Sequence, residues 1–166
     1  VLKCDIRKFF ANIDHKILFN ILAKYIPDTN ILWLLAQVIN SFSTKPNVGL
    51  PLGNLTSQLL VNIYLNEFDQ FVKHRLKAKY YIRYADDFVI LSENKPWLKQ
   101  QIPIIQEFLW ENLRLVLHPQ KIKIETIASG VDFLGWVNFP YNKIIRTRTK
   151  KRMLKRIKNH PADDTL

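Results

Sequence analysis

Apolar positions in the first part of the chain follow two spacings, one typical of strands and one of helices. Residues 1–6 form a short apolar run, which predicts a buried strand ending at Asp5. Asp14 is a suitable N-cap for a helix that ends before Pro27, and a second helix is predicted over 29–42. Prolines and glycines interrupt residues 43–53, so that segment is predicted to be a loop.

The later pattern predicts two hairpins, one further strand and three more helices. Asn54 can cap a long helix that reaches about Arg75, and 79–91 reads as a hairpin with acidic residues at its tip. A helix from Pro96 to about Leu113, a strand over 121–127, a hairpin of 131–139 with 143–147 and a helix over 150–158 follow. This order predicts an α+β fold of the split β-α-β (ferredoxin-like) type, with an antiparallel sheet and helices on one face.

Charge adds a functional expectation to this fold. The formal net charge is +11, and the stretch from Lys143 to Lys158 has nine Lys or Arg residues and no acidic one. Such a surplus favours a polyanionic partner such as nucleic acid, although a solubilising tail is an alternative. No apolar stretch is long enough for a membrane span, and a single cysteine, Cys4, is typical of a reducing compartment. We therefore expect no membrane association and a location in the cytoplasm.

Three carboxylates are the candidate chemical centre. Asp5 closes the first strand, while Asp86 and Asp87 occupy the hairpin turn. In the predicted topology these elements are neighbouring central strands, so the three groups should meet at one edge. Carboxylate oxygens without nearby His or Cys favour two Mg²⁺ ions, with Mn²⁺ as an alternative, which would lie roughly 3.5–4 Å apart for phosphoryl transfer. Taken singly, each residue could be an ordinary turn or cap residue.

Two segments surround these acidic residues: residues 81–90, YIRYADDFVI, and residues 3–10, KCDIRKFF. Both resemble motifs of reverse transcriptases, RNA-directed DNA polymerases whose catalytic palm has this fold, and the similarity runs from Val1 to about Thr147. The resemblance implies that Asp5 and Asp86 are the main metal ligands, that Asp87 assists, and that the carbonyl of Ile6 joins them. It also implies that the substrates are an RNA template, a DNA or RNA primer and dNTPs.

The resemblance assigns nucleotide contacts to two further segments. Phe10 stands where the family has a steric gate against the 2′-hydroxyl, although Phe9 or Phe10 must also belong to the core. Residues 50–58, LPLGNLTSQ, resemble the loop and helix beneath the nucleotide, which assigns Leu52, Gly53 and Gln58 to nucleotide binding. Most relatives have Gln in place of Leu52 and Pro in place of Gln58. The form found here is similar to the enzymes of diversity-generating retroelements, which copy a template RNA with frequent errors at adenine and work with a small basic accessory protein. This resemblance implies that the protein acts in the cytoplasm of a bacterium, an archaeon or a phage host.

Other residues are assigned by the same resemblance. Lys121 matches a lysine near the leaving pyrophosphate, although a surface lysine that opens a strand is an equally good interpretation. Residues 133–136, FLGW, resemble the hairpin that grips the primer end. The residues predicted to contact primer or template are Arg83, Phe133, Leu134, Gly135, Arg146, Arg148, Lys150 and Lys151.

The expected organisation is a palm over 1–127, a primer-grip-like hairpin over 128–147 and the start of a truncated thumb over 148–166. We interpret the chain as a fragment without fingers, and we expect the fragment alone to be inactive as a polymerase. Two alternatives stay open: a reverse transcriptase of the group II intron or retron type, and a non-catalytic palm that only binds nucleic acid.

Overall fold

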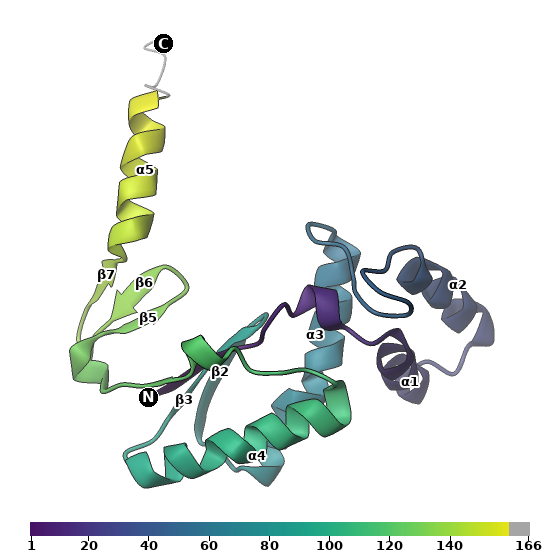
Figure 1. The fold of residues 1–166 in the computed structure, drawn as a ribbon, viewed down its shortest axis with the longest axis horizontal. Coiled ribbons are helices and arrows are strands. Elements are labelled where there is room, and N and C mark those ends of the chain that lie inside the picture. The colour runs from purple at the N-terminus through teal and green to yellow at the C-terminus, as the bar shows by residue number, and fades with distance from the viewer. Residues whose placement is uncertain (160–166) are drawn as a thin grey trace. The chain divides into compact units, whose positions relative to one another are not determined.

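The computed structural model describes residues 1–159 and divides them into two compact units, Leu2–Ile124 and a second unit formed by Glu125 onward together with Val1 (Figure 1). Residues 160–166, the end of the predicted thumb segment, lie outside the described residues. Within 1–159, no helix has both the length and the apolar content needed to cross a membrane.

The first unit is built on a four-stranded sheet. Its strands are β1 (Leu2–Asp5), β2 (Tyr80–Tyr84), β3 (Asp87–Leu91) and β4 (Lys123–Ile124), in the order β2-β3-β1-β4. All neighbouring strands are antiparallel. Since β1 and β2 are separated by β3, the chain between them must cross over the sheet, as a split β-α-β fold requires. The predicted fold class is therefore confirmed.

Four helices complete this unit: α1 (His15–Tyr25), α2 (Thr29–Asn40), α3 (Leu55–Gln70) and α4 (Lys95–Leu113). Asp14 caps α1 as predicted, because its Oδ1 accepts a hydrogen bond from the Ile17 amide at 3.0 Å. Asn54 is the N-cap residue of α3, but its side chain makes no capping hydrogen bond. After Gln70 the helix widens into one π-helical turn, Phe71–Arg75.

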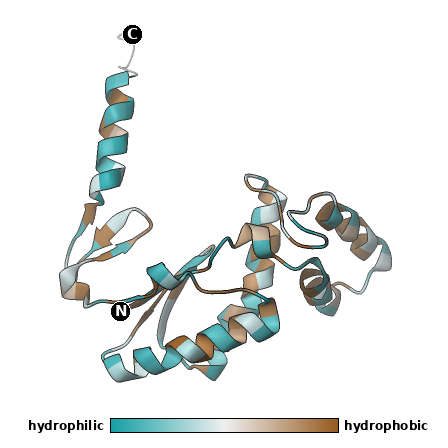
Figure 2. Cartoon of the chain, in the orientation of Figure 1, coloured by the Kyte–Doolittle hydropathy of each residue, from teal (hydrophilic) through white to brown (hydrophobic). Residues whose placement is uncertain are grey.

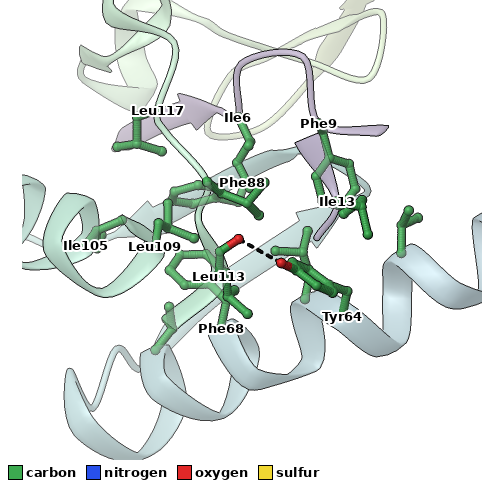
Figure 3. Close-up of a cluster of buried hydrophobic side chains, with 14 of the residues drawn as sticks. Ile6, Phe9, Ile13, Tyr64, Phe68, Phe88, Ile105, Leu109, Leu113 and Leu117 are labelled. Carbon is green, nitrogen blue, oxygen red and sulfur yellow. Dashed lines mark hydrogen bonds between the residues drawn. The ribbon is translucent and has the colours of Figure 1, made fainter. Parts of the chain in front are cut away.

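The core lies between one face of the sheet and helices α3 and α4. The Cα-paired residues Cys4 and Phe88 of β1 and β3 are fully buried on this face. The ring of Phe68 from α3 lies edge-on to Phe88, with ring centroids 5.0 Å apart. Figure 3 shows this cluster, including the hydroxyl of Tyr64, which donates a hydrogen bond to the carbonyl oxygen of Leu113 at 2.7 Å. This core fixes β1 and β3, the two strands that carry the acidic residues.

The second unit contains three short antiparallel strands and one helix. The strands are β5 (Val131–Phe133), β6 (Trp136–Asn138) and β7 (Lys143–Ile145), and the helix is α5 (Thr147–Asn159). The sequence pattern predicted a single strand over 131–139, but the chain turns at Leu134 and Gly135, both of which have positive φ. Figure 2 shows α5 mostly in the colour of hydrophilic residues.

Candidate active site

The fold brings the three predicted carboxylates to one edge of the sheet. Asp5 is the last residue of β1, and its Cα partner across the strand pair is Asp87, the first residue of β3. Asp86 lies in the turn just before, and its carbonyl oxygen accepts a hydrogen bond from the Ile6 amide at 3.1 Å. Backbone pairing therefore brings the three acidic residues to the same edge of the sheet.

Electrostatics at this edge disfavours three negative charges. Burial raises the pKa of Asp86, and the nearby charge of Asp5 raises it further. Burial also raises the pKa of Asp87, as do the charges of Asp5 and Asp86, while Lys3 lowers it. Nearby positive charge favours the ionised form of each carboxylate in such a cluster.

Lys121 supplies part of that positive charge. Its Nζ lies 2.8 Å from Asp5 Oδ2, and this hydrogen bond raises the pKa of Lys121. Lys121 ends a 3-10 turn, Pro119–Lys121, in which its amide donates to the carbonyl of His118 at 2.9 Å. The strand was predicted to begin at 121 but begins at Lys123, because residues 119–121 form this turn.

The donor set fits a hard divalent cation in chemistry. Carboxylate oxygens and a backbone carbonyl are the ligands that Mg²⁺ and Mn²⁺ prefer. In the geometry observed for residues 1–159, however, no three His, Cys, Asp or Glu side chains stand close enough together to hold one ion. Shared coordination by Asp5, Asp86 and Asp87 would therefore require their side chains to rotate toward a common point.

A cavity of about 380 Å³ lies beside the acidic turn. It brings together two of the predicted nucleotide-binding residues, Phe10 and Gln58. The complete lining is Phe10, Gln58, Val61, Asn62, Arg83, Tyr84 and Ala85. Phe9, by contrast, is a core residue with only 2% of its surface exposed. A larger cavity of about 670 Å³ between α1, α3 and α4 contains none of the predicted site residues.

Leu52 and Gly53 do not line the cavity beside the acidic turn. The side chain of Leu52 is 77% exposed. Gly53 has a φ of +91°, and a Cβ atom placed there would meet no atom within 4 Å. The glycine is therefore explained within this chain by its left-handed backbone conformation rather than by close approach of another segment.

The side chain of Arg83 is mostly buried, whereas a residue that contacts the template is expected to be accessible. Only 9% of its side chain is exposed, and its guanidinium bonds Asp69, Asn62 and the carbonyl of Ala85. The sequence interpretation missed Asn62 and Asp69 as partners. Asn62 and Asp69 are seven residues apart, which places both on one face of α3, and this spacing could have indicated a shared partner.

In the second unit, the predicted primer-grip residues form a tight turn. Phe133 pairs with Trp136, and the two residues between them, Leu134 and Gly135, have φ values of 53° and 84°. Positive φ at both central positions is typical of a type I′ hairpin turn. The turn thus presents Leu134 at an exposed tip, 48% accessible to solvent.

The predicted basic contacts of this unit fall into two groups. Arg146 pairs with Asp132, with Nη1 3.1 Å from Oδ2. Arg148, Lys150 and Lys151 are exposed on α5, a helix without any acidic residue. These three side chains, rather than Arg146, are the ones open to a polyanion.

Comparison with known proteins gives a consistent result for the greater part of the chain. A family model described as "Reverse transcriptase (RNA-dependent DNA polymerase)" matches residues 1–137. The chain is 26% identical to Protein YkfC of Escherichia coli (strain K12), an alignment that covers 98% of the chain and 51% of YkfC. It is also 26% identical to the group II intron-encoded protein LtrA of Lactococcus lactis subsp. cremoris, covering 80% of the chain and 33% of LtrA.

Among solved structures, the fold is similar to that of apo telomerase from Candida tropicalis truncated from its C-terminal domain. The TM-score is 0.59 at 14% sequence identity, and the match covers 87% of this chain and 35% of the telomerase chain. At this identity the likeness concerns the fold. The chain thus spans about half of YkfC and about a third of LtrA and of the telomerase chain.

Proposed function

Because the chain belongs to the reverse transcriptase (RNA-dependent DNA polymerase) family, we propose that it is the catalytic palm of an enzyme that copies an RNA template into cDNA. The observation that carries this proposal is the meeting of Asp5, Asp86 and Asp87 at one edge of the sheet. Since the chain spans only part of its relatives, the activity is proposed for the whole protein of which these residues form the palm.

In this proposal Asp5 and Asp86 are the main ligands of two divalent metal ions, with Asp87 and the carbonyl of Ile6 in support. When bound, such ions neutralise the carboxylates and supply the Lewis acidity for in-line nucleotidyl transfer. Burial, and to a lesser extent the neighbouring acidic charges, raise the pKa values of Asp86 and Asp87, and a bound cation would offset both effects, which supports this assignment.

Lys121 is proposed to act on the leaving pyrophosphate. Its ammonium group already lies within hydrogen-bonding distance of Asp5, so it stands beside the reacting centre. About half of its side chain is exposed, which leaves the group able to turn toward an incoming triphosphate. There it would stabilise developing negative charge or donate a proton.

The cavity beside the acidic turn is proposed to receive the sugar of the incoming dNTP. Phe10 forms one wall of this cavity and packs edge-on against the buried ring of Phe9, with ring centroids 5.5 Å apart. A ring held in this way can exclude a 2′-hydroxyl. Gln58 lines the same cavity and offers an amide to the nucleotide, whereas Leu52 and Gly53 would have to contact it from outside the lining.

Residues of the second unit are proposed to hold the primer and the template. The turn at Phe133, Leu134 and Gly135 would contact the primer end. As the start of a thumb, α5 would bind duplex phosphates through Arg148, Lys150 and Lys151. Arg146 would join these phosphate contacts after leaving its ion pair with Asp132. Phosphate contacts of this kind are independent of sequence and sensitive to salt.

Two branches of the family are candidates for the whole protein. Leu52 and Gln58 support an error-prone enzyme of a diversity-generating retroelement, in which an accessory protein could take part. The 26% identity to LtrA supports the alternative, an enzyme of the group II intron type. Replacing Leu52 by Gln should lower misincorporation at template adenines in the first case. An unchanged error spectrum would favour the alternative.

The proposed activity is tested by RNA-templated cDNA synthesis with the full-length protein. Asp86→Ala should reduce synthesis by at least about 100-fold, because it removes a ligand of both ions. Glu107→Ala, an exposed acid on α4, is the matched control and should leave synthesis unchanged. Equal synthesis by Asp86→Ala and wild type would refute the assignment.

A further inference from the structure

The turn that carries Asp86 is held in an unfavourable backbone conformation. Ala85, the residue before it, has a φ of +49°, in the left-handed region that residues other than glycine, asparagine and aspartate seldom adopt. The turn joins β2 to β3 between the paired residues Tyr84 and Asp87. Contacts with the surrounding structure must therefore hold this turn, since its own backbone preference does not.

Arg83 provides side-chain contacts with the turn, in addition to the backbone hydrogen bond that the Ile6 amide donates to the carbonyl of Asp86. Its Nη1 donates a hydrogen bond to the carbonyl oxygen of Ala85 at 3.1 Å and another to Asn62 Oδ1 at 3.1 Å. Its Nε and Nη2 both bond the carboxylate of Asp69, the Nε to Oδ1 at 2.8 Å. The guanidinium is thus bound on two sides at once, to the acidic turn and to helix α3.

Asp69 is itself fixed. Its Oδ1 also accepts a hydrogen bond from the hydroxyl of Tyr81 at 2.7 Å, and the ring of Tyr81 lies edge-on to buried Phe68. Asp69 directly follows Phe68, which has no exposed surface, so the carboxylate is anchored to the part of α3 that forms the core. Asp69 of α3 therefore fixes the guanidinium of Arg83, and the guanidinium in turn fixes the carbonyl of Ala85 in the turn.

We propose that Arg83 and Asp69 are positioning residues, which clamp the Ala85 carbonyl to α3 so that Asp86 and Asp87 face Asp5. The proposal rests on the proposed polymerase function. The same contacts shape the cavity beside the turn, because Arg83 and Asn62 line that cavity together with Phe10. With its guanidinium engaged on Asp69, Asn62 and Ala85, Arg83 acts on nucleic acid through the turn and not by direct contact.

The proposal makes a kinetic prediction for the full-length protein. Arg83→Lys keeps the charge but loses the planar fork that reaches Asp69 and Ala85 together. The single-turnover rate of dNTP addition should fall about 10- to 100-fold, as expected when catalytic groups are misplaced by a fraction of an ångström to an ångström. The Kd for primer–template should change less than about 3-fold.

A direct template contact predicts the opposite pattern. In that case Arg83→Gln would weaken primer–template binding and reduce its salt dependence by about one counterion, and the rate at saturation would be unchanged. Asp69→Asn distinguishes the clamp from a direct template contact, because the carboxylate of Asp69 would repel a phosphate and so is not itself a template contact. Under our proposal it lowers the rate as Arg83→Lys does, whereas a template contact by Arg83 predicts no loss of rate.

Glu67→Gln is the matched control, with the same change of charge two residues earlier on α3. Among residues 1–159, the carboxylate of Glu67 pairs with exposed Lys24 at 3.4 Å, far from the acidic turn in sequence, so this variant should retain the wild-type rate. Rates are taken per active site from the burst amplitude, which removes any effect of a partly unfolded sample. If wild type is inactive, the proposed function fails. If wild type is active and Arg83→Lys and Asp69→Asn both retain its rate, the clamp is refuted and the function stands.

Discussion

At the scale of single residues, the hydroxyl of Tyr64 satisfies a backbone carbonyl at the end of α4. Leu113 is the last residue of that helix, so its carbonyl has no partner within the helix. Tyr64 has no exposed surface and donates to this carbonyl at 2.7 Å (Figure 3). The contact joins α3 to α4 beneath the sheet.

Tyr64→Phe should therefore lower the free energy of unfolding by about 1–3 kcal/mol, the usual cost of a buried acceptor left without a partner. Urea unfolding with a fixed m-value measures the change. Tyr25→Phe is the control, because the side chain of Tyr25 is mostly exposed. Equal stability of the two variants would show that the hydrogen bond is not formed in solution.

Phe10 gives a residue-scale test of the nucleotide cavity. If its ring excludes the 2′-hydroxyl, Phe10→Ala should reduce discrimination against ribonucleotides by about 10- to 200-fold, the range that one steric contact supplies. Primer extension with dNTPs and with rNTPs measures the ratio of kcat/KM values. Phe10→Tyr keeps the bulk and should keep the selectivity; unchanged selectivity in Phe10→Ala would remove Phe10 from the site.

At the scale of elements, the β5–β6 turn places Leu134 in a conformation that suits another residue better. Its φ of 53°, followed by Gly135 at 84°, is the pattern for which Asn-Gly is preferred. Leu134→Asn should stabilise the hairpin by about 1 kcal/mol, since Asn tolerates the left-handed region. Hydrogen exchange of the β6 amides measures this locally, and faster exchange in the variant would contradict it.

If Leu134 contacts the primer, the same substitution should weaken primer binding while it stabilises the hairpin. A leucine kept at a position of positive φ would then be a functional residue retained at a cost in stability. Stabilisation without any loss of primer affinity would assign Leu134 to the turn alone.

The elements also show how far sequence patterns reach. The cap at Asp14 and the hairpin at 79–91 depend on neighbouring residues, and both are as predicted. The strand expected from 121 fails because the 3-10 turn at Pro119–Lys121 forms through a backbone hydrogen bond that apolar periodicity does not encode. The partners of Arg83 were missed for a different reason: Asp69 and Asn62 meet it only after α3 packs on the sheet.

At the scale of the whole molecule, charge is divided between two tasks. Three acidic residues of the first unit, Asp5, Asp86 and Asp87, lie at one sheet edge, whereas helix α5 of the second unit carries several basic residues and no acidic one. This separation suits an enzyme that binds metal ions at one place and phosphates at another.

The phosphate contacts can be tested by salt dependence in the full-length protein. Replacing Lys150 and Lys151 by Gln should weaken primer–template binding and reduce the slope of log Kd against log salt by about 1 per residue. Lys16→Gln with Lys99→Gln, exposed on α1 and α4, removes the same charge and should leave the slope unchanged. Equal slopes for the two pairs would exclude α5 as the phosphate-binding helix.

The central claim is that Asp5, Asp86 and Asp87 together hold two divalent metal ions. The most direct measurement is the number of Mn²⁺ ions bound by the full-length protein with primer–template and a nonhydrolysable dNTP, counted by electron paramagnetic resonance against protein-free controls. We predict two ions for wild type and for Glu107→Gln, and fewer than two for Asp86→Asn. Two ions bound by Asp86→Asn, or none bound by wild type, would contradict the account.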